Sequence, residues 1–504
     1  MNQGAMRIGV VLGVVTVLAV GAAFVPRGLG SPSTAAQQAT RLPLRQAAFA
    51  CPESAYAKDA TRTDLAAVAP AGRVSLLEAG ARVTGGGLPA RIELTPLGED
   101  KPVASGERRA RLVAHTVRRP RTPPMLISAQ GTLAPGAMAS QLTRTTRGEL
   151  RGLAEASCPA PRSEFWFVGA GSQIGRHGRL HLTNVDSAEA HVALRLWDEN
   201  GPVDLGSGRS VVVPPGDQTV VELDQLAPTS KRLAVLVRAT RGRISAALRD
   251  DAVDGETPVG IDWIPTATRP AREVVLPAVA GGAGPRTLTV VAPGDSTATV
   301  DLTIIGRNGS FEPVGLGTFD VEPGSVKDVR IDKAVRGEAV AIRLVSDVPI
   351  TATVRSQLGS GDGPRDVVYS AAAAPLSSQA VVPYTPTGDR TSATLILATP
   401  STRRSSRLTV TLTDSKGQRV GSTTVVMKPG SSVEVPLKPK RKVPAYVALV
   451  ELEDGGPIYG ARFLVEKGQA GPMISGWQLE PGVTSAVRPV ALPDLGAAVD
   501  RSSH

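Results

Sequence analysis

A glycine-rich segment at residues 165–175, FWFVGAGSQIG, is the first part of the sequence that could bind a ligand. An apolar run opens into Gly169, Gly171 and Gly175, as a strand opens into a nucleotide-binding loop. The dinucleotide fingerprint, however, has two residues between its second and third glycines and leads into a helix. This segment has three such residues and leads into an alternating strand. We therefore expect a structural strand and turn, and no cofactor.

Histidines and acidic residues are the next candidates, because they could hold a metal ion. His177 and His181 share one face of an expected strand, and His191 could approach them across a hairpin. No other histidine follows until the last residue, so solvent-facing strand residues are the simpler interpretation. Segment 249–256, RDDAVDGE, is the nearest approach to a calcium loop, but a solvated acidic turn is the simpler interpretation. We predict no metal site.

Arginines are concentrated in segment 108–121, RRARLVAHTVRRPR. Smaller basic groups lie at 402–407 and 438–442, and the chain has a formal net charge of +10. In an exported protein the available partners are anionic lipid headgroups or phosphate-bearing wall polymers, and not nucleic acid. Solvated charges that protect strand edges from association are the simpler interpretation, and binding of an anionic partner is the alternative that we carry forward. The residues concerned are Arg108, Arg109, Arg111, Arg118, Arg119 and Arg121.

The chain has two cysteines, Cys51 and Cys158. In an exported chain they most simply form one disulfide, which would close a loop of about 107 residues and stabilise the fold by about 4–5 kcal/mol. Two buried free thiols are the alternative. Two isolated cysteines are too few for a structural zinc site.

The N-terminus predicts export. Residues 8–24 contain no charge, and this length lies between that of a signal peptide and that of a spanning helix. Arg7 precedes the run, which favours a cytoplasmic N-terminus over residues 1–7. We predict a single-pass membrane anchor over residues 8–25, with signal cleavage as the alternative, and a linker over 26–44. In either case most of the chain is extracytoplasmic, in the cell membrane or secreted.

Beyond residue 160 the sequence repeats. Pro-Gly turns at 215–216, 323–324 and 429–430 are 108 and 106 residues apart, and each precedes an alternating strand. An aromatic residue follows each turn at a similar distance, at Trp263, Tyr369 and Trp477. About seven short strands fit each unit, as in an immunoglobulin-like β-sandwich.

These signals predict an all-β chain of tandem immunoglobulin-like β-sandwich domains behind a single N-terminal transmembrane helix. The expected repeats span 161–268, 269–376 and 377–482, and short linkers between them favour an articulated rod. Residues 45–160 lack the repeat spacing and are expected to form a divergent β-domain closed by the disulfide. Residues 483–504 are expected to be a flexible tail.

The sequence also resembles a known family. Cys51-Pro52-Glu53, Cys158-Pro159 and the segment 164–169, EFWFVG, follow an N-terminal membrane segment. Together these features resemble the actinobacterial family of exported membrane-associated proteins known as domain of unknown function 5719. The resemblance implies an exported, membrane-associated protein and carries no known active site.

No GxSxG, HExxH or Walker motif occurs in the sequence. We therefore expect a non-catalytic, membrane-anchored β-sandwich protein that binds or spaces a cell-envelope partner, such as an anionic wall polymer, a lipid headgroup or an envelope protein. Two alternatives stay open: an accessory subunit of a membrane-bound envelope-biosynthesis enzyme, and an exported enzyme acting on envelope polysaccharide. The sequence leaves the oligomeric state open.

Overall fold

The structure, a computed structural model, describes residues 41–54, 61–71, 88–119, 121–359, 361, 363–376, 378–401 and 403–487. The predicted N-terminus, membrane segment and most of the linker lie outside these residues, as do residues 488–504 of the predicted tail. No helix in the described ranges is long and apolar enough to span a membrane. The chain divides into two compact units, Met1–Leu42 with Ala486–His504, and Pro43–Ser485. Strand β1 (Arg41–Pro43) pairs with β35 (Ser485–Val487).

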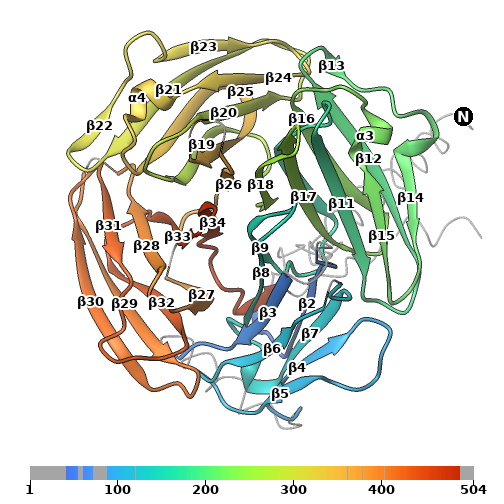
Figure 1. Cartoon of the computed structure of the whole chain (residues 1–504), viewed down its shortest axis with the longest axis vertical. Coiled ribbons are helices and arrows are strands. Elements are labelled where there is room, and N and C mark those ends of the chain that lie inside the picture. Colours follow the sequence, from blue (N-terminus) through green and yellow to red (C-terminus); the bar gives the residue numbers. More distant parts are fainter. Residues whose placement is uncertain are drawn as a thin grey trace, which may run out of the picture. The chain divides into compact units, whose positions relative to one another are not determined.

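The regular secondary structure of the unit Pro43–Ser485 consists almost entirely of antiparallel strands, which confirms the all-β prediction (Figure 1). Its described helical turns are short: α3 (Leu223–Leu226), α4 (Asp332–Val335), η1 (Gly131–Leu133) and η2 (Gly206–Arg209). Val- and Leu-rich alternating segments favour this outcome, because one face of each strand can enter an apolar core while the other faces solvent.

The strands form four sandwiches, and those of each sandwich lie within one of the predicted ranges. The first contains β2 (Gln46–Cys51), β3 (Thr61–Val68), β4 (Arg91–Pro96), β5 (Ala104–Gly106), β6 (Val113–Val117), β7 (Met125–Gln130), β8 (Met138–Thr145) and β9 (Gly152–Ser157). The second contains β10 (Glu164–Ala170), β11 (Arg176–Asn184), β12 (Ala190–Asp198), β13 (Gly201–Pro202), β14 (Ser210–Val213), β15 (Asp217–Glu222), β16 (Leu233–Arg241), β17 (Ser245–Asp254) and β18 (Thr257–Ile264).

The third sandwich contains β19 (Ala271–Val279), β20 (Arg286–Ala292), β21 (Ala298–Gly306), β22 (Gly309–Phe311), β23 (Thr318–Val321), β24 (Ser325–Arg330), β25 (Val340–Leu358) and β26 (Asp366–Ala371). The fourth contains β27 (Gln379–Pro386), β28 (Thr391–Ala398), β29 (Ser406–Asp414), β30 (Arg419–Met427), β31 (Ser432–Pro436), β32 (Ala445–Asp454), β33 (Tyr459–Gly468) and β34 (Gly471–Gln478).

All four sandwiches have one strand order. In the first, the two sheets run β2-β7-β4-β5 and β6-β3-β8-β9; in the fourth they run β27-β32-β29-β30 and β31-β28-β33-β34. The second repeats this order with its fourth strand split into β13 and β14, and in the third the long strand β25 supplies both the sixth and seventh positions. Residues 45–160 therefore form a fourth copy, although their sequence lacks the repeat spacing.

The topology differs from the predicted one in two respects. Each sandwich has eight strand positions, where about seven were expected. The first strand pairs with the sixth, as β2 does with β7, whereas in an immunoglobulin domain it pairs with the second. The immunoglobulin-like topology is therefore not confirmed. The glycines of the three Pro-Gly turns occupy equivalent positions. Each precedes the fifth strand of its sandwich, and their φ angles lie between 61° and 63°; they are Gly216, Gly324 and Gly430.

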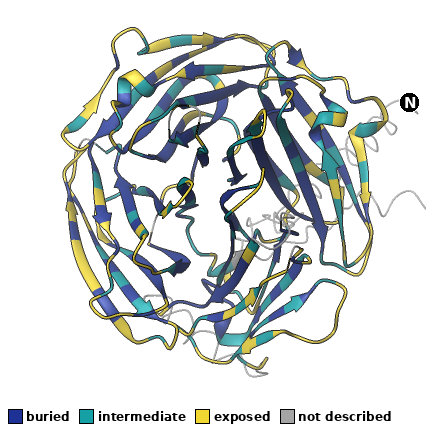
Figure 2. Cartoon of the chain, viewed as in Figure 1, coloured by how far each residue is buried: buried dark blue, intermediate teal, exposed yellow. Residues whose placement is uncertain are grey.

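The last strand of each sandwich, which we call its closing strand, joins it to its neighbours. β9 contacts β18 and β34, and β26 contacts the same two strands, so the contacts form a closed cycle (Figure 1). These strands are buried over most of their length (Figure 2). The expectation of an articulated rod is therefore wrong, because the first and fourth sandwiches contact each other directly.

Candidate functional site

The predicted disulfide is present. Cys51, the last residue of β2, is bonded to Cys158, the residue after β9, with an S–S distance of 1.96 Å. Both residues are buried in the core of the first sandwich. The bond therefore ties the first strand of this sandwich to its closing strand.

The structure divides the six predicted arginines into two groups. Arg108 and Arg111 precede β6, Arg118 and Arg119 follow it, and all four are exposed. β6 is an edge strand of its sheet, and its five residues separate the two pairs by about 17 Å at a strand rise of about 3.3 Å per residue.

The other two arginines bind within the first sandwich. The Arg109 guanidinium donates hydrogen bonds to the carbonyls of Pro70 (2.7 Å), Pro135 (3.2 Å) and Thr132. Arg121 pairs with the buried Glu53 carboxylate at 2.6 Å. These two side chains therefore hold loops together, and the six arginines do not form one surface.

Arg108 and Arg111 instead lie beside a basic turn of the fourth sandwich. The Leu112 N–H donates to the Ser415 carbonyl at 3.1 Å, and a Cβ placed on Gly417 would lie 3.0 Å from the Ala110 carbonyl oxygen. The turn at 415–418 is in turn bound to the loop 438–442, because Arg441 donates to Gln418 at 2.9 Å and Lys440 N–H donates to Val420 at 2.7 Å.

This arrangement brings together exposed cations that are some 300 residues apart in sequence. We call it the cationic surface; its residues are Arg108, Arg111, Lys416, Arg419, Lys438, Lys440, Arg441 and Lys442. Two acidic residues border it. Glu107 pairs with Arg91 at 3.4 Å, and Asp414 is buried and paired with Arg441. The surface therefore carries an excess of positive charge that faces solvent.

The glycine-rich segment is structural, as expected. β10 ends at Ala170 and the chain turns into strand β11, with no helix between them. Gly175 has a φ of 80°, and a Cβ there would lie 2.6 Å from the Val253 carbonyl oxygen. The Arg176 guanidinium donates to the Gly169 carbonyl and to Asp250 at 2.8 Å. Ile174, at the turn, is fully exposed.

The three histidines have separate surroundings. His177 and His181 lie on β11 in one sheet of the second sandwich, and His191 lies on β12 in the other. His177 contacts Asp224 at 3.2 Å, and His191 contacts Glu189 at 2.9 Å. No group of three or more potential metal-ligating side chains occurs among the described residues.

His181 is buried, and its ring meets the Trp263 ring edge-on with a centroid distance of 5.1 Å. Burial, together with the positive charges of Arg249 and Arg179, lowers the pKa of His181 to about 3. Three acidic residues of segment 249–256, namely Asp250, Asp251 and Asp254, are paired with arginines. Asp251 binds Arg179 at 2.8 Å and Arg249 at 3.3 Å.

Buried carboxylates join the closing strands. The Asp366 carboxylate, at the start of β26, accepts hydrogen bonds from the N–H groups of Leu153 (3.0 Å), Ile261 (3.3 Å), Val367 (3.0 Å) and Ile474 (2.8 Å). These donors belong to all four closing strands. Burial raises the pKa of Asp366 to about 7, although the four N–H donors lower it.

A second buried carboxylate, Glu155 on β9, connects the first sandwich to the fourth. It accepts from the guanidinium of Arg462 at 2.6 Å and from the Ser475 hydroxyl at 3.2 Å. Both members of the Glu155–Arg462 pair have fully buried side chains. Burial raises the pKa of Glu155, and the positive charge of Arg462 opposes this.

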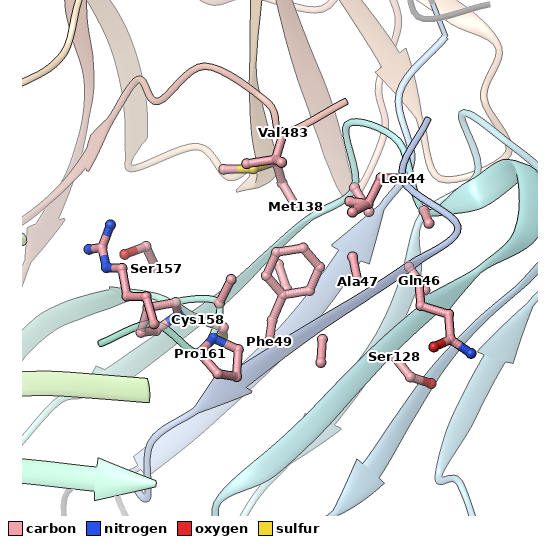
Figure 3. Close-up of a pocket in the computed structure, with 18 of the residues that line it drawn as sticks. Leu44, Gln46, Ala47, Phe49, Ser128, Met138, Ser157, Cys158, Pro161 and Val483 are labelled. Carbon is pink, nitrogen blue, oxygen red and sulfur yellow. The ribbon is translucent and has the colours of Figure 1, made fainter. Parts of the chain in front are cut away.

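A pocket of about 640 Å³ opens beside the disulfide (Figure 3). Its walls come from β2, β7 and β8 of the first sandwich, from the link to the second sandwich, and from the segment after β34. Leu44, Ala47, Phe49, Met138 and Val483 line it with apolar atoms. Arg162, Arg243 and Glu480 supply its charged groups.

The sequence model of a family of unknown function, DUF5719, matches residues 113–438. The chain belongs to this family. In this DUF5719 protein the match begins at β6 of the first sandwich and ends just after β31 of the fourth, so it includes Lys416 and Arg419 of the cationic surface. No curated protein sequence matches the chain.

Several solved structures resemble parts of this DUF5719 protein. The crystal structure of Thermotoga maritima 1070 has 17% sequence identity and a TM-score of 0.18, and covers 20% of this chain and 93% of that chain. The Bacteroides uniformis β-glucuronidase has 10% identity and a TM-score of 0.10, with 48% and 26% covered. Dimeric latent PorU from Porphyromonas gingivalis has 12% identity and a TM-score of 0.13, with 65% and 35% covered.

Proposed function

We propose that this protein is a non-catalytic, membrane-anchored extracytoplasmic scaffold that binds an anionic cell-envelope polymer. The cationic surface is the observation that carries the proposal. Lysine and arginine side chains attract phosphate groups, and a polymer with many phosphates can contact several of them at once. The membrane anchor and export rest on the N-terminal sequence, and the Cys51–Cys158 disulfide is typical of proteins outside the cytoplasm.

The construction of the surface favours an extended ligand over a small one. Its cations come from two loops of the fourth sandwich and one of the first, and backbone hydrogen bonds such as Leu112–Ser415 fix these loops to one another. A row of fixed charges matches a linear polyanion better than a single phosphate does, because each additional contact adds to the attraction.

Binding of long-chain inorganic polyphosphate to the purified full chain tests the proposal. The variant Arg111→Gln/Lys416→Gln removes one cation from the first sandwich and one from the fourth. We expect about a tenfold loss of affinity for polyphosphate, since exposed charge pairs contribute up to about 1 kcal/mol each. Raising the salt from about 0.1 M to 1 M should weaken binding, because the screening length falls from about 10 Å to about 3 Å.

The matched control is Arg403→Gln/Arg404→Gln. These exposed arginines precede β29, whereas Asp414 and the basic turn lie at its other end. The control removes the same amount of charge, all of it from the fourth sandwich, and should leave the affinity within about twofold of wild type. Equal losses in both variants, or binding that salt does not weaken, would show that the cationic surface is not the binding site.

A further inference from the structure

We infer that the pocket beside the disulfide binds an amphiphile that has one aliphatic chain and an anionic head group. The pocket volume of about 640 Å³ lies within the range of about 300–1,000 Å³ that is usual for small-molecule sites. The site is separate from the cationic surface, and the inference does not depend on the proposed function.

The apolar part of the pocket fits an aliphatic chain. Phe49 is only half-buried, and its ring lies between Met138 and Pro161 (Figure 3). Val483, on another wall, is 60% exposed. These side chains present apolar surface that a ligand would remove from water, and this transfer favours binding in proportion to the area covered.

The walls are fixed without a ligand. β2 pairs with β7 along its whole length, and the disulfide holds Cys158 against the end of β2. The Ala50 N–H donates to the Pro159 carbonyl at 3.1 Å, and the Gly136 N–H donates to the Val483 carbonyl at 2.9 Å. A preformed pocket loses little conformational freedom when a ligand enters.

Arg162 gives the pocket its preference for an anion. Arg162 is exposed, so a ligand can reach its guanidinium, which lies over the Phe165 ring at 4.3 Å. A guanidinium binds a carboxylate or a phosphate strongly, because its planar fork can donate two hydrogen bonds to either group. Among the described residues no side chain accepts a hydrogen bond from it, whereas Arg243 already makes two bonds of 2.9 Å to Asp186.

Glu480 also lines the pocket, and its charge bears on an anionic ligand. Burial raises the pKa of Glu480, although the Arg162 charge lowers it. Glu480 is half-buried, and the raised pKa makes it less acidic than an exposed glutamate. Arg162 and Glu480 are therefore compatible with a head group of either chemistry, carboxylate or phosphate.

Displacement of a fluorescent fatty acid, dansylamino-undecanoic acid, from the purified full chain tests the inference. Dodecanoate, dodecyl phosphate and neutral dodecanol are the competitors. We expect the fluorescent fatty acid to bind saturably at one site, and both anionic competitors to displace it. The relative affinities of dodecanoate and dodecyl phosphate then show which head group the pocket prefers. Dodecanol should bind at least tenfold more weakly than the tighter anion. Equal binding of dodecanol would overturn the inference.

Three variants separate the contributions of the pocket. Ala47→Trp fills it from a half-buried wall position and should abolish binding of all three competitors. Arg162→Gln should remove the preference for anions and leave the dodecanol affinity unchanged, and Arg162→Lys should restore part of that preference. Thermal unfolding confirms that each variant is folded. Fatty-acid binding that survives in folded Ala47→Trp would place the site elsewhere and refute the inference.

The control is the Arg111→Gln/Lys416→Gln variant of the cationic surface. It should bind the fatty acid like wild type, because neither residue lines the pocket. The two sites can therefore fail independently. A parallel loss of fatty-acid affinity in this control would mean that the probe binds the cationic surface, which would contradict the inference.

Discussion

At the scale of single residues, Ala110 explains why the first sandwich has no recognisable repeat. It lies before β6, where the other sandwiches have Gly216, Gly324 and Gly430, and its φ of 63° matches theirs. A residue with a Cβ adopts this left-handed conformation at a cost of about 1–2 kcal/mol. The turn before the fifth strand therefore has the same backbone conformation in all four sandwiches, although the first sandwich has Arg109-Ala110 in place of Pro-Gly.

Replacement of Ala110 by glycine should stabilise the protein. We expect Ala110→Gly to raise the free energy of unfolding by about 1 kcal/mol, because glycine adopts positive φ without a steric penalty. Chemical denaturation of the full chain measures the change. The reverse control is Gly216→Ala, where a Cβ would meet no atom within 4 Å, so that only the backbone is affected. It should lower the free energy by a similar amount, and a stabilised Gly216→Ala would contradict this explanation.

The buried His181 should make stability depend on pH. Its folded pKa of about 3 is below the unfolded value of about 6.5, so the unfolded chain binds a proton first as the pH falls. The histidine therefore lowers the free energy of unfolding by about 1.4 kcal/mol per pH unit between about pH 6 and pH 3. Asp366, with its pKa raised to about 7, acts in the opposite direction over part of this range.

The comparison of wild type with His181→Phe isolates the histidine contribution. Phenylalanine retains a ring against Trp263 and does not titrate. Denaturation curves at pH 7 and pH 5 should show that wild type loses about 2 kcal/mol relative to the variant. Identical pH profiles would mean that His181 is not held neutral in the folded protein.

At the scale of elements, the closing strands determine how the sandwiches meet. Each closing strand is the edge strand of its sheet, and an exposed edge would present unpaired backbone groups to solvent. Here the neighbouring closing strands cover that edge. Glycines allow the close approach. A Cβ on Gly260 of β18 would lie 2.5 Å from the Val367 nitrogen of β26. Asp366 then accepts N–H groups that the strand pairing leaves free.

Asp366→Asn should destabilise this meeting point. The amide has one acceptor oxygen where the carboxylate has two, and each carboxylate oxygen accepts from two of the four backbone donors, so two donors lose their partner. Each buried donor without a partner costs about 1–3 kcal/mol, and we expect a loss of about 2–5 kcal/mol in the free energy of unfolding. Asp332→Asn, at an ion pair with exposed Arg330, is the control and should cost less than about 1 kcal/mol. Equal effects would show that Asp366 is not a structural centre.

At the scale of the whole molecule, local patterns predicted the strands and the disulfide but not the assembly. The repeat in residues 161–482 was visible because its turns need glycine and its strands alternate. The Glu155–Arg462 pair, by contrast, joins residues 307 positions apart, and neither residue has a neighbour in sequence that indicates the other. The cationic surface was predicted in part, because segments 108–121 and 438–442 both contribute to it. Arg109 and Arg121 instead bind within the first sandwich, and the sequence did not single out Lys416 or Arg419. The pocket gave no signal, since its walls come from distant parts of the chain and many of their residues are alanine or proline.

The two ends of the four-sandwich unit also meet. The Leu44 N–H donates to the Thr484 carbonyl at 3.1 Å, so the chain enters and leaves this unit at one place. Since the closing strands form a cycle, no sandwich is first or last in space. The contacts among the four sandwiches therefore do not depend on which link between them carries the chain ends. A circularly permuted chain, opened at another link and joined near Leu44 and Thr484, would form the same set of contacts.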